Sequence, residues 1–94
     1  MNDRSDEPVQ APTIEFPCDY PIKVIADSHP ELIESVVMIV ADFDPTVTHD
    51  KVRHRPSKHG SYTSVTVTMR ATGEPQLKAM FEVFKEQSWV RMVL

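Results

Sequence analysis

The sequence predicts an α+β domain of ferredoxin-like βαββαβ topology: a two-layer sandwich with an antiparallel four-stranded sheet and two helices on one face. Three observations lead to this prediction. Around residues 20–24 and 62–71, apolar and polar side chains alternate as they do in strands. Around residues 32–43 and 77–84, apolar residues recur at helical spacing. Turn-forming residues separate these segments, and right-handed crossovers would place both helices on the same face.

The first strand and the first helix are predicted from residues 19–43. Tyr20, Ile22 and Val24 alternate with polar or turn residues and indicate a half-buried strand. Ser28 followed three residues later by Glu31 forms the pattern of a capping box, which would place His29 and Pro30 in the first helical turn. The predicted buried face of this helix consists of Leu32, Ile33, Val36, Val37, Ile39, Val40 and Phe43.

The middle of the chain is predicted to form a hairpin. Residues 46–55 are rich in β-branched side chains, but Val47 and Val52 have opposite parity, which indicates a bulge or a late strand start. Residues 56–61 have the composition of a turn. The next strand is the clearest in the chain, because its apolar residues alternate regularly with hydroxylic ones. Its apolar face is Val65, Val67, Met69 and Ala71.

The last helix and strand complete the predicted order. Gly73, Glu74 and Pro75 end the third strand and begin a helix. The predicted core face of this helix is Leu77, Met80, Phe81 and Phe84. In the final strand we expect Val90, Met92 and Leu94 to point inward, with Arg91 on the opposite face.

Composition limits the domain organisation and the class of protein. The 94 residues suffice for one domain, predicted at residues 16–94, after a disordered tail at residues 1–15 that has little to bury. Cys18 is the single cysteine, so an intramolecular disulfide is excluded. With no apolar signal segment and no run of apolar residues long enough to span a bilayer, the sequence predicts a cytoplasmic protein without membrane attachment.

No residue pattern reaches the standard of a catalytic, cofactor or metal site, so we expect none of the three. The three histidines at positions 49, 54 and 59 recur every fifth residue, which puts neighbours on opposite faces of a strand rather than around one ion. Gly60 and Gly73 are too few for a phosphate-binding loop. Cys18 has no base assigned to it, and we interpret it as a structural thiol.

Charge is distributed unevenly and suggests a binding surface. Residues 27–50 contain six acids and no Lys or Arg, whereas residues 51–70 contain five Lys or Arg and no acid. A solvated basic hairpin explains this pattern without any partner. A functional interpretation assigns a partner-binding loop to Arg55, Ser57, Lys58, His59, Gly60 and Tyr62. It also assigns contacts on the sheet face without helices to Lys23, Ser64, Thr66, Arg70 and Arg91, with Thr68, Ile25 and Val93 on the same face.

Nucleic-acid binding is the alternative use of the basic hairpin. RNA-recognition domains of this topology stack bases on aromatic side chains of the open sheet face. Here the third strand offers Ser64, Thr66 and Thr68, and Tyr62 is the only aromatic residue, at the start of the strand. The net charge of −4 also disfavours a general nucleic-acid binder.

Several short motifs resemble the YbeD-like family of small bacterial proteins of unknown function. They are Phe16-Pro17 before the first strand, Pro56-Ser57 with Gly60-x-Tyr62-x-Ser64-Val65-Thr66, and the terminal Val90-Arg91-Met92-Val93-Leu94. The resemblance covers residues 16–94. It implies a βαββαβ fold similar in shape to ACT domains, and it brings no established catalytic residues. Some relatives are encoded beside lipoate-attachment enzymes, which does not transfer as an activity.

The sequence therefore leads to a non-enzymatic regulatory or protein-interaction module with ACT-like architecture. We expect an unidentified protein partner, and the sheet face leaves a homodimer open. A nucleic-acid-binding module is the alternative, and an enzyme or enzyme subunit is the third class.

Overall fold

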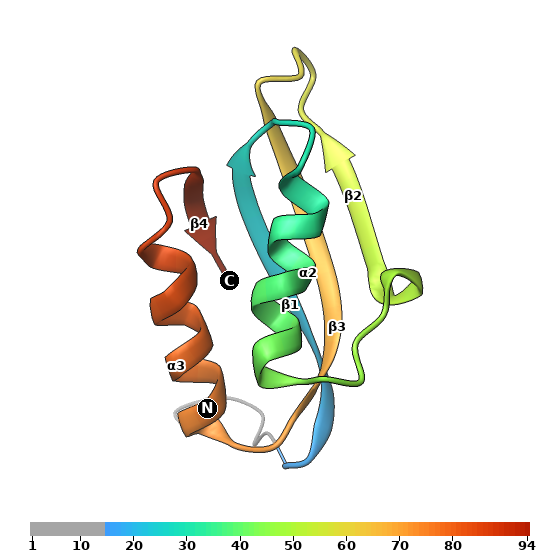
Figure 1. The fold of residues 1–94 in the computed structure, drawn as a ribbon, viewed down its shortest axis with the longest axis vertical. Coiled ribbons are helices and arrows are strands. Elements are labelled where there is room, and N and C mark those ends of the chain that lie inside the picture. The colour runs from blue at the N-terminus through green and yellow to red at the C-terminus, as the bar shows by residue number, and fades with distance from the viewer. Residues whose placement is uncertain (1–14) are drawn as a thin grey trace, which may run out of the picture.

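The computed structural model describes residues 15–94 and shows four strands and two helices in the order β-α-β-β-α-β (Figure 1). The predicted disorder of the N-terminal tail falls on residues 1–14, which lie outside the described residues. The elements are β1 (Cys18–Asp27), α2 (Leu32–Phe43), a 3-10 turn η1 (His49–Lys51), β2 (Val52–Pro56), β3 (Tyr62–Ala71), α3 (Glu74–Lys85) and β4 (Val90–Val93).

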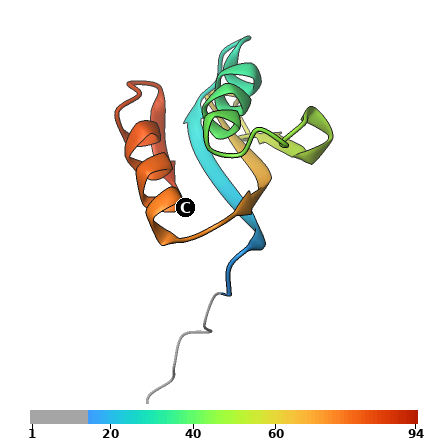
Figure 2. The ribbon, with the colours of Figure 1, turned by 60° about the horizontal axis from the view of Figure 1, so that its bottom comes forward.

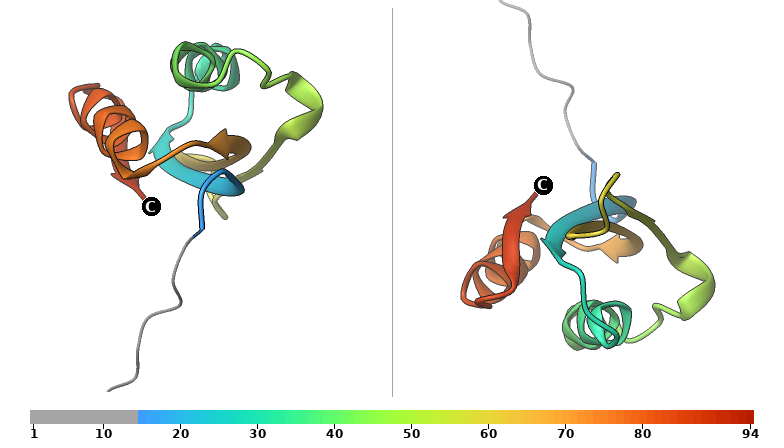
Figure 3. Two further views of the ribbon diagram at one scale, coloured as in Figure 1. Left: turned by 90° about the horizontal axis from the view of Figure 1, so that it is seen from below. Right: turned by 90° about the horizontal axis from the view of Figure 1, so that it is seen from above.

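The sheet is antiparallel with strand order β2-β3-β1-β4. Its centre is the long pair of β1 and β3, in register from Cys18 opposite Ala71 to Asp27 opposite Tyr62, and both strands curve strongly (Figure 2). The end-on views show α2 and α3 on the same side of this sheet (Figure 3). The predicted fold class is therefore confirmed. Within residues 15–94 no helix covers the opposite face, here called the open face.

The core lies between the sheet and the two helices, and most of it follows the predicted periodicity. On the sheet, alternate residues of a strand face the same layer, so the inward side chains of β3 and of the second half of β1 are almost fully buried, while Cys18 and Tyr20 at the start of β1 are partly buried. The helices contribute the faces expected from their spacing, but four of the predicted residues, Ile33, Ile39, Phe43 and Phe81, are only partly buried against the core. The buried residues from the helices are Leu32, Val36, Val37, Val40, Leu77, Met80 and Phe84.

The predicted capping box is wrong. α2 begins at Leu32, and Glu31 occupies the N-cap position without a side-chain cap. Ser28 lies outside the helix, where its Oγ is 2.7 Å from Thr63 Oγ1 and its N–H donates to the Ser61 carbonyl. Ser28 thus ties the β1–α2 loop to the beginning of β3. His29 also precedes the helix, and its ring packs edge-on against Trp89 at 5.7 Å between centroids.

The predicted orientation of the last strand is also partly wrong. Met92 and Leu94 are 50% and 56% exposed, whereas Val93 packs against the core together with Val90. The cause is a register shift: Ile25 pairs with Met92 while Ala26 pairs with Val90, so Arg91 is an extra residue on β4. Met92, rather than Val93, shares the open face with Ile25.

The late start of the second strand is confirmed. Thr46 and the residues after it form a turn and the 3-10 segment His49–Lys51 before β2 begins at Val52. Val47 is buried and belongs to the core. Arg53 and Arg55 are two residues apart in β2 and therefore stand on the same face, the open face, opposite Thr66 and Ser64 of β3.

Candidate functional site: a cationic hollow on the open sheet face

Two rows of paired residues cross the open face. One row runs from Arg53 on β2 through Thr66 on β3 to Lys23 on β1. The next row runs from Arg55 through Ser64 to Ile25, and then to Met92 on β4. Side chains of directly paired residues stand on the same face of a sheet. The rows therefore place cations at the β2 edge, hydroxyls in the middle and apolar side chains towards β4.

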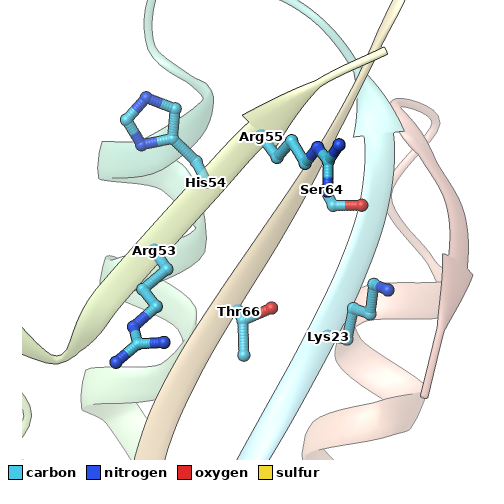
Figure 4. Close-up of a pocket in the computed structure, with 6 residues that line it drawn as sticks. All are labelled: Lys23, Arg53, His54, Arg55, Ser64 and Thr66. Carbon is cyan, nitrogen blue, oxygen red and sulfur yellow. The ribbon is translucent and has the colours of Figure 1, made fainter.

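The cationic ends of these rows surround an open hollow of about 320 Å³, here called the cationic hollow. Figure 4 shows Arg55 extending from β2 towards Ser64, Arg53 further down the same strand, Thr66 on β3 and Lys23 across on β1. His54 also borders the hollow, but it pairs with Val65, a core residue, and points away from Thr66. Five side chains from three neighbouring strands therefore face one hollow: Lys23, Arg53, Arg55, Ser64 and Thr66.

The cations of the hollow differ from the other cations of the open face in their pairing. Among the described residues, Lys23, Arg53 and Arg55 have neither an ion pair nor a side-chain hydrogen bond. By contrast, the Arg70 guanidinium lies 3.3 Å from Asp19, and Arg91 donates to both Asp27 oxygens, at 2.8 and 3.0 Å. The hydrogen bonds to Asp27 raise the pKa of Arg91.

The predicted open-face contacts therefore divide into two groups. Lys23, Ser64 and Thr66 meet in the cationic hollow, whereas Arg70 and Arg91 form ion pairs with Asp19 and Asp27. Arg53 was missing from the predicted set. The signal that could have found it is its spacing of two residues from Arg55, which places both on one face of any strand that contains them.

The predicted binding loop is built as a compact hairpin turn. Ser57 donates its N–H to the Tyr62 carbonyl at 2.7 Å, and its Oγ accepts from the Tyr62 N–H at 3.2 Å. Gly60 adopts a φ of +77°, a left-handed conformation that few other residues tolerate, and donates to the Ser57 carbonyl. These bonds hold the loop while Lys58 and His59 project, exposed, at its tip.

A second hollow of about 360 Å³, here called the hairpin hollow, adjoins the first. It shares Arg55 and Ser64 with the cationic hollow, and its other walls are Ile25, Pro56, Ser57 and Tyr62. The structure thus brings Arg55, Ser57 and Tyr62 of the predicted loop together. Lys58, His59 and Gly60 line neither hollow. A binding role for this loop stays a prediction.

The histidines do not converge. His49 Nε2 lies 3.0 Å from a Glu34 carboxylate oxygen, His54 is on β2 and His59 is at the hairpin tip. Within residues 15–94, no three His, Cys, Asp or Glu side chains are grouped so that they could hold a metal ion. In the same part of the chain, no helix has the length and apolar character needed to cross a membrane.

Comparisons with known proteins place the chain among bacterial relatives. Residues 11–94 match the family described as protein of unknown function DUF493. A UPF0250 protein of Paraburkholderia phytofirmans is 45% identical over 80 residues, covering 85% of this chain and 90% of the relative. UPF0250 protein BPP0168 of Bordetella parapertussis is 38% identical over 87 residues, covering 93% and 96%. The solution structure of HP0495 from H. pylori superposes with a TM-score of 0.69 at 18% identity, covering 93% of this chain and 91% of that one, and supports the fold alone.

Proposed function

The chain belongs to the DUF493 family of proteins of unknown function, and we propose that it is a non-enzymatic interaction module that regulates a partner protein by binding it through the open sheet face. One observation carries the proposal: Lys23, Arg53 and Arg55 line a single hollow and have no carboxylate partner within the described residues. Side chains that hold unbalanced charge close together favour an anionic ligand.

The chemistry of the hollow supports binding rather than catalysis. Ser64 and Thr66 are its only hydroxyl groups, and in residues 15–94 neither has a histidine or carboxylate hydrogen-bonded to it that could act as a base. Arginine remains protonated at every physiological pH and does not accept protons. Such a set of groups can hold and orient a negative charge, and this is what a binding module requires.

The other half of the open face supports a protein partner. Towards β4 the face presents Ile25, Met92 and Leu94, of which the last two are at least half exposed. Protein interfaces combine an apolar centre with a polar, charged rim. A nucleic acid would instead require aromatic side chains for stacking, and Tyr62, at one end of β3, is the only one on this face of the described strands.

Affinity capture with matched variants tests the proposal. The double variant Arg53→Gln/Arg55→Gln removes two cations of the hollow, and Lys78→Gln/Lys85→Gln removes two exposed cations from α3. Tagged forms of all three proteins are incubated with lysate of the native host, and the bound proteins are identified. We expect the first variant to lose the partner that the wild type and the second variant retain. Equal capture of the same proteins by both variants would refute binding through the cationic hollow, on which the proposal rests.

The nucleic-acid alternative is tested in parallel. A single-stranded RNA is titrated against the wild-type protein at two salt concentrations. Binding that weakens steeply with salt, and is lost in Arg53→Gln/Arg55→Gln, would favour the nucleic-acid module over the protein-interaction module.

A further inference from the structure

We infer that the open face binds an extended acidic peptide, in which a carboxylate side chain enters the cationic hollow and an apolar side chain two residues away enters the hairpin hollow. This inference rests on the proposed function and deepens it by naming the chemistry of the partner. It is carried by three features of the two hollows: their charge, their spacing and the apolar wall of the second one.

Charge identifies the first group of the ligand. Arginine presents a planar fork of N–H donors that matches the two oxygens of a carboxylate, and lysine adds a compact positive charge. Arg53 and Arg55 stand two residues apart on β2, and Lys23 faces Arg53 across Thr66. A carboxylate in this hollow would therefore meet cations from two sides and hydroxyl groups from β3 between them.

The second hollow identifies what accompanies the carboxylate. Ile25, Pro56 and Tyr62 provide carbon surface, and Tyr62 is 45% exposed. Burial of such surface by an apolar side chain is favourable. A bare phosphate or a nucleic-acid backbone would leave this wall uncovered, so the pair of hollows favours a peptide that carries both an acid and an apolar residue.

Spacing fixes the separation of the two side chains along the peptide. The residues of the hairpin hollow lie one row further along the strands than those of the cationic hollow. On β1, Ile25 replaces Lys23, and on β3 the pair Ser64 and Tyr62 replaces the pair Thr66 and Ser64. A step of two residues along a strand covers about 7 Å. In an extended peptide, side chains at i and i+2 also stand on one face about 7 Å apart. The matching sequence is therefore an acid, any residue, and an apolar residue, in either chain direction.

The full-length protein, labelled with nitrogen-15, tests the inference by NMR titration. The probe peptides are acetyl-Ser-Glu-Ser-Leu-Ser-amide and its reverse sequence. Three controls replace Glu by Gln, replace Leu by Ser, or remove the spacer so that Glu and Leu are adjacent. We expect amide shifts at Ser64 and Thr66 for one or both probe orders, and an affinity lower by about tenfold for the Gln control. The other two controls should also bind more weakly than the probe.

Protein variants assign each arm of the peptide to its hollow. Lys23→Gln/Arg53→Gln should lower the affinity for the Glu probe by about tenfold or more and leave that for the Gln control unchanged. The matched variant Lys78→Gln/Lys85→Gln should bind as the wild type does. Tyr62→Thr should reduce the difference between the Leu probe and its Ser control. The nitrogen-15 NMR spectrum of every variant must show that the variant is folded.

Several results would overturn the inference. The inference fails if the Gln control, or the peptide with adjacent Glu and Leu, binds as tightly as the Glu probe. It also fails if inorganic phosphate produces the same amide shifts as the probe, or if neither probe order produces any. If the peptides fail while capture still depends on Arg53 and Arg55, the ligand class is wrong and the proposed function stands. If Arg53→Gln/Arg55→Gln captures the same proteins as the wild type, the proposed function itself fails. Self-association of the protein that competes with the probe would identify a second copy as the occupant.

Discussion

The carboxylate of Asp44 accepts a hydrogen bond of 2.7 Å from the backbone N–H of Arg70, which fastens the end of α2 to β3. The same side chain accepts bonds from the N–H and the hydroxyl of Thr46, at 3.0 and 2.6 Å. Asp44 is only 6% exposed. A buried carboxylate with three donors is stabilising when all are present and costly when one partner is removed.

We predict that Asp44→Asn destabilises the domain by about 2 kcal/mol, because the amide lacks the charge that strengthens these bonds and turns one donor group towards other donors. The free energy of unfolding is measured by urea titration at pH 7. Asp42→Asn is the control, since Asp42 is exposed on the same helix. An equal, small effect of both substitutions would mean that the Asp44 bonds contribute little.

Asp44 should also make stability depend on acidity. Burial of the carboxyl raises its pKa, but the hydrogen bonds from Arg70 and Thr46 outweigh this effect and bring it below the ordinary value of 3.8. A carboxyl with a lower pKa in the folded state stabilises the protein above its unfolded pKa, and this contribution disappears as the pH falls through the folded pKa. We predict that the free energy of unfolding falls below about pH 4, and falls less in Asp44→Asn. Parallel curves for the two proteins between pH 7 and 2 would contradict this.

Two phenylalanines of α3 should differ in their contribution to the core. Phe84 is fully buried, whereas Phe81 lies partly exposed at the edge of the same face. Phe84→Ala should cost about 3–5 kcal/mol, since it removes a ring from a closed core, and Phe81→Ala should cost clearly less. Urea denaturation of both variants gives the comparison. A larger loss for Phe81→Ala would show that the α3 face is rotated relative to the sheet.

Elements with a local, regular pattern could be predicted from the sequence, and those decided by distant partners could not. The alternation of Val65, Val67 and Met69 fixes the face of β3, because strand geometry alone determines it. The capping prediction at Ser28 failed because Thr63 and Ser61, more than thirty positions away, provide its partners instead. Tertiary contacts of this kind leave no local signature.

The same distinction applies to the last strand and to the candidate site. The orientation of Met92 depends on a bulge opposite Ile25 and Ala26, which nothing in the strand's own sequence marks. Basic character of the hairpin was visible in the sequence. The division into paired and unpaired cations could not be predicted from the sequence, because Arg70 and Arg91 form ion pairs with carboxylates 51 and 64 positions away.

Arg55 and Lys58 should differ sharply in binding, although both are exposed cations of the predicted loop. Arg55 lines both hollows, whereas Lys58 projects from the hairpin tip and lines neither. We predict that Arg55→Gln abolishes capture of the partner and weakens binding of the acidic peptide, while Lys58→Gln retains both. Neither change should move the melting temperature by more than about 2 °C, because no packed side chain is lost. If Lys58→Gln is the variant that loses the partner, recognition occurs at the hairpin tip and not on the open face.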